Sequence, residues 1–256
     1  MRIVISEDAK ALGVNSADFV AESINAAIKD HGSARVVFST GASQLTMIEE
    51  LVKRDVDWSK VDMFHLDEYV DLPETHIASF RKYLRERLIE KVNFRSANLV
   101  DGTPEGIRAL TEKLREAPID IGLIGIGENA HIAFNDPPAD FDTKEAYIIV
   151  NLNDTCKRQQ VREGWFATVD DVPKQAVSMT VYQILECRQI ISVVPYAVKA
   201  DAIAKTLHND VTNTIPATIM KGHDDFHIFV DKDSYSKVDE EKIVTVNGKS
   251  CTIIKA

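Results

Sequence analysis

The sequence predicts an α/β protein with a mainly parallel β-sheet that is covered by helices on both faces. Short apolar stretches alternate along the chain with longer stretches whose apolar residues recur at helical spacing. This alternation is typical of β-α-β units with right-handed crossovers. The chain has 256 residues, 45% of them hydrophobic, so it is long enough to bury a core. No repeat, linker or low-complexity segment divides it, and we expect residues 1–256 to form a single domain.

The amino-terminal half begins with a predicted strand, Met1–Ser6, and a predicted helix, Ala9–His31. The helix has apolar residues at helical spacing and is followed by Gly32, a common helix terminator. The same alternation of patterns then predicts strand Ala34–Phe38, helix Leu45–Arg54, strand Val61–Leu66 and helix Ala78–Lys91.

The carboxyl-terminal half has more strands than helices. We predict helices over residues 104–116 and 197–207, and strands over 119–124, Tyr147–Val150, Ala176–Thr180, Gln189–Val194 and Phe226–Val230. The tail differs, because Asn247-Gly248 separates two strand-like stretches, Glu241–Val246 and Ser250–Ile254. An Asn-Gly pair in that setting predicts a C-terminal β-hairpin with a type I′ turn.

Charge and cysteine content narrow the classes of partner. The chain has 40 acidic and 30 basic residues, a formal net charge of −10. This balance argues against nucleic acid or an anionic membrane and favours a small-molecule partner. Cys156, Cys187 and Cys251 have no metal-ligand spacing, so we expect no metal site and a reducing compartment, the cytoplasm. No apolar segment resembles a signal peptide or a membrane span.

The most informative segment is the polar, glycine-broken run Gly125–Pro138, which follows the apolar stretch 119–124. It places His131 among carboxylates and amides, including Asn129 and Asp136, at the carboxyl end of a strand, where α/β sheets bind ligands. Neighbouring polar groups can fix the tautomer of an imidazole and tune it for acid/base chemistry. The alternative is a histidine that only caps a helix or satisfies a core hydrogen bond.

A second candidate segment, Ser39-Thr40-Gly41-Ala42-Ser43, joins a predicted strand to a predicted helix. Free backbone N–H groups, the helix dipole and several hydroxyls would converge there, where a phosphate could bind. It is not a Walker motif, because no lysine follows. The alternative is that Thr40 or Ser43 simply caps the helix.

Two adjacent carboxylates, Asp67 and Glu68, follow the strand predicted over Val61–Leu66. In a pocket they would repel each other and lose water, which can raise one pKa toward the range of a general base. The alternative is a solvated acidic turn before a helix.

Lys199 lies in the first turn of a predicted helix, in the segment Val194–Lys199. A cation there opposes the helix dipole, which is easier to explain if the ammonium reaches an anionic ligand. The alternative is a lysine that extends into solvent.

Together these segments resemble the glucosamine-6-phosphate isomerase/deaminase family. The resemblance rests on Ser39–Ser43, on Leu-Asp-Glu-Tyr-Val-x-Leu-Pro-x-x-His beginning at Leu66, on Gly-Ile-Gly-x-x-x-His-Ile-Ala-Phe-Asn-Asp-Pro beginning at Gly125, and on Val194–Lys199. It covers about residues 34 to 230. It implies a Rossmann-like fold and conversion of a 2-amino-2-deoxyhexose 6-phosphate into a ketose 6-phosphate with loss of ammonia, without metal or cofactor, as in amino-sugar and N-acetylglucosamine catabolism.

The resemblance also implies roles for individual residues. Asp67 would be the general base that moves a proton between C2 and C1, and His131 would open the sugar ring. Asp136 matches a family glutamate that orients this histidine. Because it is one methylene shorter, contact would require a closer backbone or a bridging water. The residues matched to substrate binding are Ser39, Thr40, Gly41, Ala42, Ser43, Glu68, Lys199 and a lid arginine, Arg158, in a lid-like segment of about 145–172.

Several positions depart from the family pattern. Asn129 stands where the well-studied deaminases carry an aspartate, and Ala130 replaces a glycine. An amide cannot stabilise imidazolium with a full negative charge, so Glu128 is a candidate source of that charge. Only Lys144 remains of a basic segment found in allosteric members, so we expect no effector site of that type. The family's oligomeric state is not carried over, and a homo-oligomer stays open.

Two rival functions are weighed against the deaminase. The first is a 6-phosphogluconolactonase, which shares the fold and a similar Gly-x-Gly-Glu-x-x-His loop. The Phe-Asn-Asp-Pro run after His131 and the Asp67-Glu68-Tyr69 block favour the deaminase. The second is a catalytically weak sugar-phosphate-binding protein, suggested by Asn129. The sequence leaves open the C4 configuration of the substrate and the physiological direction.

Overall fold

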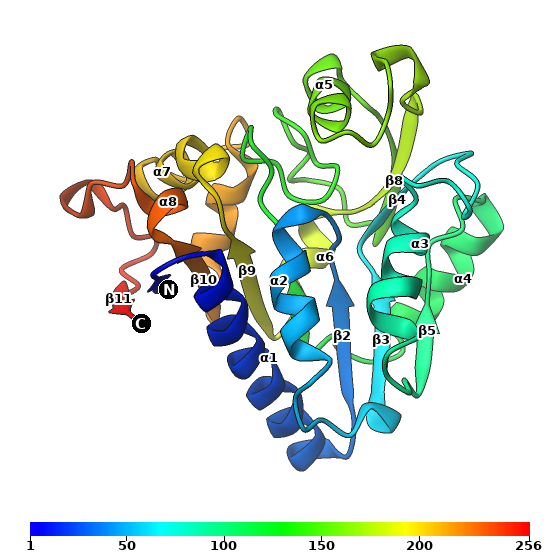
Figure 1. Cartoon of the computed structure of the whole chain (residues 1–256), viewed down its shortest axis with the longest axis horizontal. Helices are drawn as coiled ribbons and strands as arrows, with labels where there is room; N and C mark the ends of the chain where they lie inside the picture. The colour runs from blue at the N-terminus through cyan, green and yellow to red at the C-terminus, as the bar shows by residue number, and fades with distance from the viewer.

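A computed structural model describes all 256 residues and shows an α/β fold built on an eight-stranded sheet (Figure 1). Every pair of neighbouring strands in this sheet is parallel, which confirms the predicted fold class. The strand order is β11-β1-β10-β9-β6-β2-β3-β5. In chain order these strands are β1 Arg2–Ser6, β2 Ala34–Phe38, β3 Val61–His65, β5 Ser96–Asn98, β6 Ile121–Leu123, β9 Gln189–Val194, β10 Phe226–Asp231 and β11 Thr252–Lys255.

Helices cover both faces of the sheet, because alternate residues of each buried strand point to opposite sides. Val36 and Phe38 of β2 pack in one hydrophobic cluster with α1, α2 and α3, whereas Val37 between them packs in another with α4, α6 and α7. The helices are α1 Ala9–His31, α2 Ala42–Leu51, α3 Phe80–Leu84, α4 Pro104–Arg115, α5 Asp154–Arg162, α6 Val181–Leu185, α7 Ala200–His208 and α8 Lys232–Tyr235. None of them is long and apolar enough to cross a membrane.

Local capping explains the best-predicted helix. Asp8 accepts hydrogen bonds from the backbone of Lys10 and Ala11 at the start of α1, and Gly32 ends the helix with φ 85°, a conformation that favours glycine. The helix predicted over Ala78–Lys91 is instead a short α-helix, α3, that continues as a π-helical turn over Arg85–Ile89.

A second, antiparallel sheet stands at the carboxyl edge of the main one (Figure 1). It contains β4 Asp67–Tyr69, β8 Gln175–Met179 and β7 Tyr147–Asn151, in the order β4-β8-β7. Strands near 147–150 and 176–180 were predicted correctly, but they do not join the parallel sheet. The chain leaves β3 through Leu66 directly into β4, and that short strand gives β8 a partner.

The C-terminal hairpin prediction was wrong in its strand pairing. Asn247 and Gly248 do form the predicted turn, with φ 54° and 69° and a hydrogen bond from Lys249 N to Val246 O of 3.0 Å. Residues 243–246 form no strand, and β11 pairs in parallel with β1. The free edge of β1 provides a full ladder for the tail, which explains why the tail pairs there and not with its preceding segment.

Candidate active site

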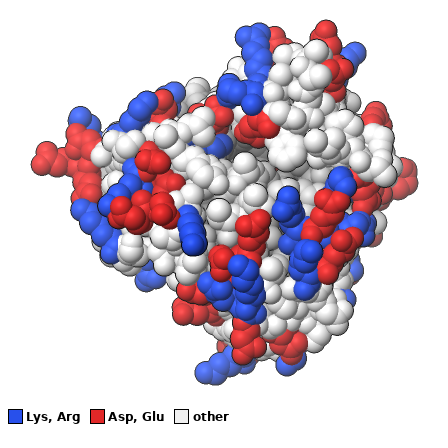
Figure 2. All heavy atoms as spheres, viewed as in Figure 1, with Lys and Arg blue, Asp and Glu red and all other residues white.

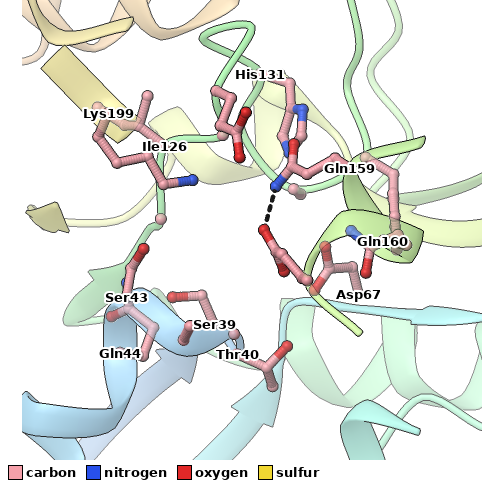
Figure 3. Close-up of a pocket in the computed structure, with 18 of the residues that line it drawn as sticks. Ser39, Thr40, Ser43, Gln44, Asp67, Ile126, His131, Gln159, Gln160 and Lys199 are labelled. Carbon is pink, nitrogen blue, oxygen red and sulfur yellow. Dashed lines mark hydrogen bonds between the residues drawn. The ribbon is translucent and has the colours of Figure 1, made fainter. Parts of the chain in front are cut away.

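Four loops meet at the carboxyl edge of the parallel sheet. They follow β9, β6, β2 and β3, which are neighbours in the strand order, so the segments after these strands lie side by side as parallel topology requires. They line a cavity of about 340 Å³, drawn in Figure 3. The cavity opens as a hollow beneath the lobe that carries α5 (Figure 2).

The loop after β2 presents an uncapped helix end to this cavity. Helix α2 has Gly41 as its N-cap, with φ 103°, and no side chain caps it. The alternative in which Thr40 or Ser43 caps the helix is therefore wrong. Residues Ser39 to Ser43 all line the cavity, and the Ser39 hydroxyl is buried without a hydrogen-bond partner. An uncapped helix end with free donors is suited to an anion.

Lys199 also reaches this end of the cavity. Its side chain is only 6% exposed and lines the cavity, pointing toward the Ser43 side (Figure 3). Burial lowers the pKa of Lys199, although Glu163 and Glu128 oppose that effect. The alternative of a solvent-exposed lysine is wrong, and a buried ammonium needs an anionic partner.

Asp67 and Glu68 are neighbours in β4 but occupy different environments. Asp67 lines the cavity, and burial, together with the charge of Glu68, raises the pKa of Asp67 to about 8. Glu68 is fully buried and does not line the cavity. It accepts hydrogen bonds from the backbone of Phe80 and Arg81 and from the Ser79 hydroxyl.

The assignment of Glu68 to substrate binding is thus contradicted by its position. Successive side chains in a strand point to opposite faces, so Asp67 faces the cavity while Glu68 faces the start of α3. There it holds the helix and pairs with the Arg81 guanidinium at 3.3 Å. Its influence on the site is electrostatic, through the pKa of Asp67.

His131 is oriented by a carboxylate and, through that carboxylate, by an amide. Its Nδ1 lies 3.1 Å from Asp136 Oδ1, and the side chains are 13% and 12% exposed. Asn129 Nδ2 donates to the same Asp136 oxygen at 3.0 Å, and Asn129 Oδ1 accepts from the backbone N–H of His131 at 3.1 Å. Asp136 therefore reaches the imidazole directly, and the shorter side chain needs no bridging water.

The ionisation of Asp136 follows from these contacts. Burial acts to raise the pKa of Asp136, but His131 and Asn129 outweigh burial, and the pKa is lowered overall. Asp136 is thus held as a carboxylate, in contact with His131. Glu128, which we expected to supply a negative charge to His131, forms an ion pair with Arg162 instead.

The loop backbone makes room for the imidazole. A Cβ atom at Gly127 would lie 2.3 Å from His131 Cε1 and Nε2, so only glycine fits there. Ala130, which replaces the family glycine, adopts φ 64°, a left-handed conformation that costs a non-glycine residue roughly 1–2 kcal/mol.

Helix α5 closes the remaining side of the cavity. It lies in the lid-like segment of about 145–172, but the helix itself was not predicted from the sequence. Gln159, Gln160, Arg162, Glu163 and Trp165 line the cavity. Arg158, matched to the lid arginine, does not line it; its side chain is 69% exposed and pairs with Asp154 at 3.5 Å. The arginine on the cavity is Arg162, about one turn further along the helix. Residues four apart lie on the same face of a helix, so spacing alone does not distinguish Arg162 from Arg158.

No group of three or more His, Cys, Asp or Glu side chains is arranged to hold a metal ion. The cavity has two chemically distinct ends, the uncapped start of α2 with Lys199 and the carboxyl of Asp67. They lie on opposite sides of it, with Lys199 and Ser43 facing Asp67 across the space (Figure 3).

Comparison with known proteins matches most of the chain to one family. The profile of the family described as glucosamine-6-phosphate isomerases/6-phosphogluconolactonase matches residues 7–228. A glucosamine-6-phosphate deaminase of Staphylococcus epidermidis is 34% identical over 243 residues, covering 90% of this chain and 97% of the relative. One of Streptococcus uberis is 33% identical over 213 residues, covering 82% and 89%.

Solved structures show the same fold. A monomeric glucosamine-6-phosphate deaminase superposes with a TM-score of 0.83 at 24% identity, covering 93% of this chain and all of that one. The 6-phosphogluconolactonase of Trypanosoma brucei superposes with a TM-score of 0.76 at 16% identity, covering 93% and 98%.

Proposed function

Since this chain belongs to the glucosamine-6-phosphate isomerase/6-phosphogluconolactonase family, we propose that it is a glucosamine-6-phosphate deaminase. The reaction converts D-glucosamine 6-phosphate and water into D-fructose 6-phosphate and ammonia. The observation that carries the proposal is a cavity with an anion-binding end opposite a buried carboxyl, Asp67, beside a histidine held by a carboxylate. The relatives named deaminases match this chain at 33–34% identity, which favours this activity over the lactonase.

His131 opens the sugar ring in this mechanism. Its imidazole transfers a proton between the anomeric hydroxyl and the ring oxygen, giving the open-chain aldehyde. Asp136, 3.1 Å from Nδ1, fixes the ring and stabilises the imidazolium that forms during the transfer.

Asp67 then moves the proton from C2 to C1. It removes the C2 proton while O1 gains one, which gives an enolamine, and returns a proton to C1, which leaves an iminium at C2. Water adds to that carbon and ammonia leaves, so no external electron acceptor is needed. With a pKa raised to about 8, the carboxyl is poised to hold and release a proton near neutral pH.

The phosphate occupies the opposite end. The free N–H groups at the start of α2, the Ser39 hydroxyl and the Lys199 ammonium supply donors there. Arg162, now paired with Glu128 at the rim, supplies a further cation. The segment of about 145–172, which carries α5, acts as the lid over the bound sugar.

We place the enzyme in the cytoplasm as one catalytic domain. Its three cysteines are unpaired, as expected in a reducing compartment. A sugar phosphate is its small-molecule partner. The assay described next decides whether it deaminates the gluco or the galacto epimer.

The decisive experiment is ammonia release from glucosamine 6-phosphate and galactosamine 6-phosphate, with acid release from 6-phosphogluconolactone measured beside it. We expect ammonia from at least one hexosamine phosphate and no turnover of the lactone. Asp67→Asn should abolish turnover while leaving the affinity for inorganic phosphate within about twofold. Lactone hydrolysis without ammonia release would establish the lactonase, and sugar-phosphate binding with no turnover by the unaltered protein would establish a binding protein.

A further inference from the structure

Helix α5 carries a buried polar side chain that the mechanism above does not use. Gln160 is 7% exposed and lines the cavity. Its carboxamide makes no hydrogen bond within the protein, in contrast to that of Gln159, the other glutamine of this helix that lines the cavity. Gln159 is 8% exposed and donates from Nε2 to Glu163 Oε1 at 2.8 Å, the contact drawn as a dashed line in Figure 3. The Gln160 carboxamide is thus free to bind a ligand or water in the cavity.

The position of Gln160 indicates which part of a ligand it meets. Its carboxamide points into the same side of the cavity as Asp67, away from Lys199 and Ser43 (Figure 3). With the phosphate at the Lys199 end, the reacting carbons C1 and C2 lie at the Asp67 end. The Gln160 carbonyl and the Asp67 carboxyl are thus two acceptors, neither bound to a protein donor, that face the carbon bearing the amino group.

We propose that Gln160 recognises the C2 amino group, so that it selects a 2-amino sugar phosphate over the corresponding 2-hydroxy compound. This inference rests on the proposed function and adds to it the residue that binds the C2 amino group of the substrate. An ammonium offers three N–H donors. The Gln160 carbonyl and the Asp67 carboxyl accept two of them, and the amide remains neutral, so it holds the group without adding a second buried negative charge beside Asp67.

A pair of inhibitors isolates this contact. 2-Amino-2-deoxyglucitol 6-phosphate and glucitol 6-phosphate cannot cyclise or turn over, and they differ at the C2 substituent alone. We expect the unaltered enzyme to bind the amino compound more tightly. Gln160→Met keeps the side-chain length and removes the acceptor, so it should cut that preference about 10- to 100-fold, the range for a hydrogen bond to a charged group, with little change for glucitol 6-phosphate.

Matched variants distinguish recognition from a structural effect. Gln160→Glu retains acceptor oxygens and should preserve the preference. Gln159→Met alters an equally buried glutamine of the same helix, whose Nε2 already donates to Glu163, and it should leave the ratio of the two inhibition constants unchanged. Binding of inorganic phosphate by each variant reports that the cavity is intact.

The outcomes separate this inference from the function it rests on. Failure of the unaltered protein to release ammonia would refute the proposed function. An active unaltered protein whose Gln160→Met variant keeps the full preference for the amino inhibitor would overturn the role of Gln160 alone. Equal weakening of both inhibitors by Gln160→Met would also overturn it.

Discussion

The contact between Asn129 and Asp136 makes a sharp prediction about the substitution Asn129→Asp. In the structure Asn129 Nδ2 donates to Asp136 Oδ1 at 3.0 Å. An aspartate would put a carboxylate oxygen in place of that donor, so two partly buried negative charges would face each other at the same separation. Although an aspartate is the residue of the well-studied deaminases at this position, we expect it to be harmful in this chain.

The magnitude follows from the distance. At an effective dielectric constant of about 20, two unit charges 3 Å apart repel by roughly 5 kcal/mol, which corresponds to about four pKa units. One of the two carboxyls would therefore keep its proton in the folded protein, while both ionise near pH 4 in the unfolded chain. A raised pKa in the folded state means that the variant loses stability as the pH rises.

Chemical denaturation at two pH values measures this effect. Relative to the unaltered protein, Asn129→Asp should lower the free energy of unfolding by about 1.5 kcal/mol at pH 5 and by about 5 kcal/mol at pH 8. The double variant Asn129→Asp/Asp136→Asn restores a donor facing an acceptor and should recover most of that loss. It should not recover ammonia release, because the carboxylate no longer lies against His131 Nδ1.

Two results would refute this reasoning. One is a stability difference between Asn129→Asp and the unaltered protein that does not change between pH 5 and pH 8. The other is a double variant no more stable than Asn129→Asp, since the coupling between these positions is what the cycle measures.

Three further substitutions test other parts of the site. Gly127→Ala should reduce kcat/KM about 100-fold, because the new Cβ would lie 2.3 Å from the His131 imidazole and displace it. Gly125→Ala is the control and should retain activity, because its nearest contact would be an ordinary one, 3.4 Å from Gln44 Nε2. Arg162→Met should raise KM about tenfold or more, with Arg158→Met, outside the cavity, leaving KM unchanged. Asp67→Asn should stabilise the fold at pH 8 and have little effect at pH 4. The pKa of Asp67 is about 8 in the folded protein and 3.8 for an unperturbed aspartate, so the unaltered protein loses stability as the pH rises between these two values. Urea unfolding at both pH values checks this.

Most of the parallel sheet could be predicted from the sequence because its strands are short, fully apolar and separated by strongly periodic helices. Strand β2 and helix α1 have the predicted bounds, since apolar pattern, cap and terminating glycine agree there. The elements that were missed, such as β5 and β4, have three residues each, too few for a period to show. The tail was misassigned because an Asn-Gly turn specifies a local reversal but not the partner of the strand that follows.

The candidate site was likewise only partly predicted from the sequence. Loops that follow apolar strands were found, because parallel strands bring their carboxyl ends together whatever the loops contain. Helix α5 was not found, since it has no apolar stripe that would mark it in the sequence and contributes polar residues to the cavity. Glu68 was misplaced for a third reason: adjacent carboxylates look alike in sequence, and only the strand direction of β4 decides that Asp67 faces the cavity and Glu68 faces α3.

The two departures around His131 are best understood together. Taken singly, Asn129 lacks the charge needed to stabilise an imidazolium, and Asp136 is one methylene shorter than the glutamate it replaces. In the structure the shorter carboxylate lies directly against Nδ1, and the amide donates to that carboxylate while accepting from the backbone of His131. A carboxylate at 136 needs a donor beside it, and an amide at 129 needs a carboxylate elsewhere to supply the charge. The two departures therefore compensate for each other. Asp136 supplies the negative charge next to His131, and Asn129 orients both the Asp136 carboxylate and the His131 backbone.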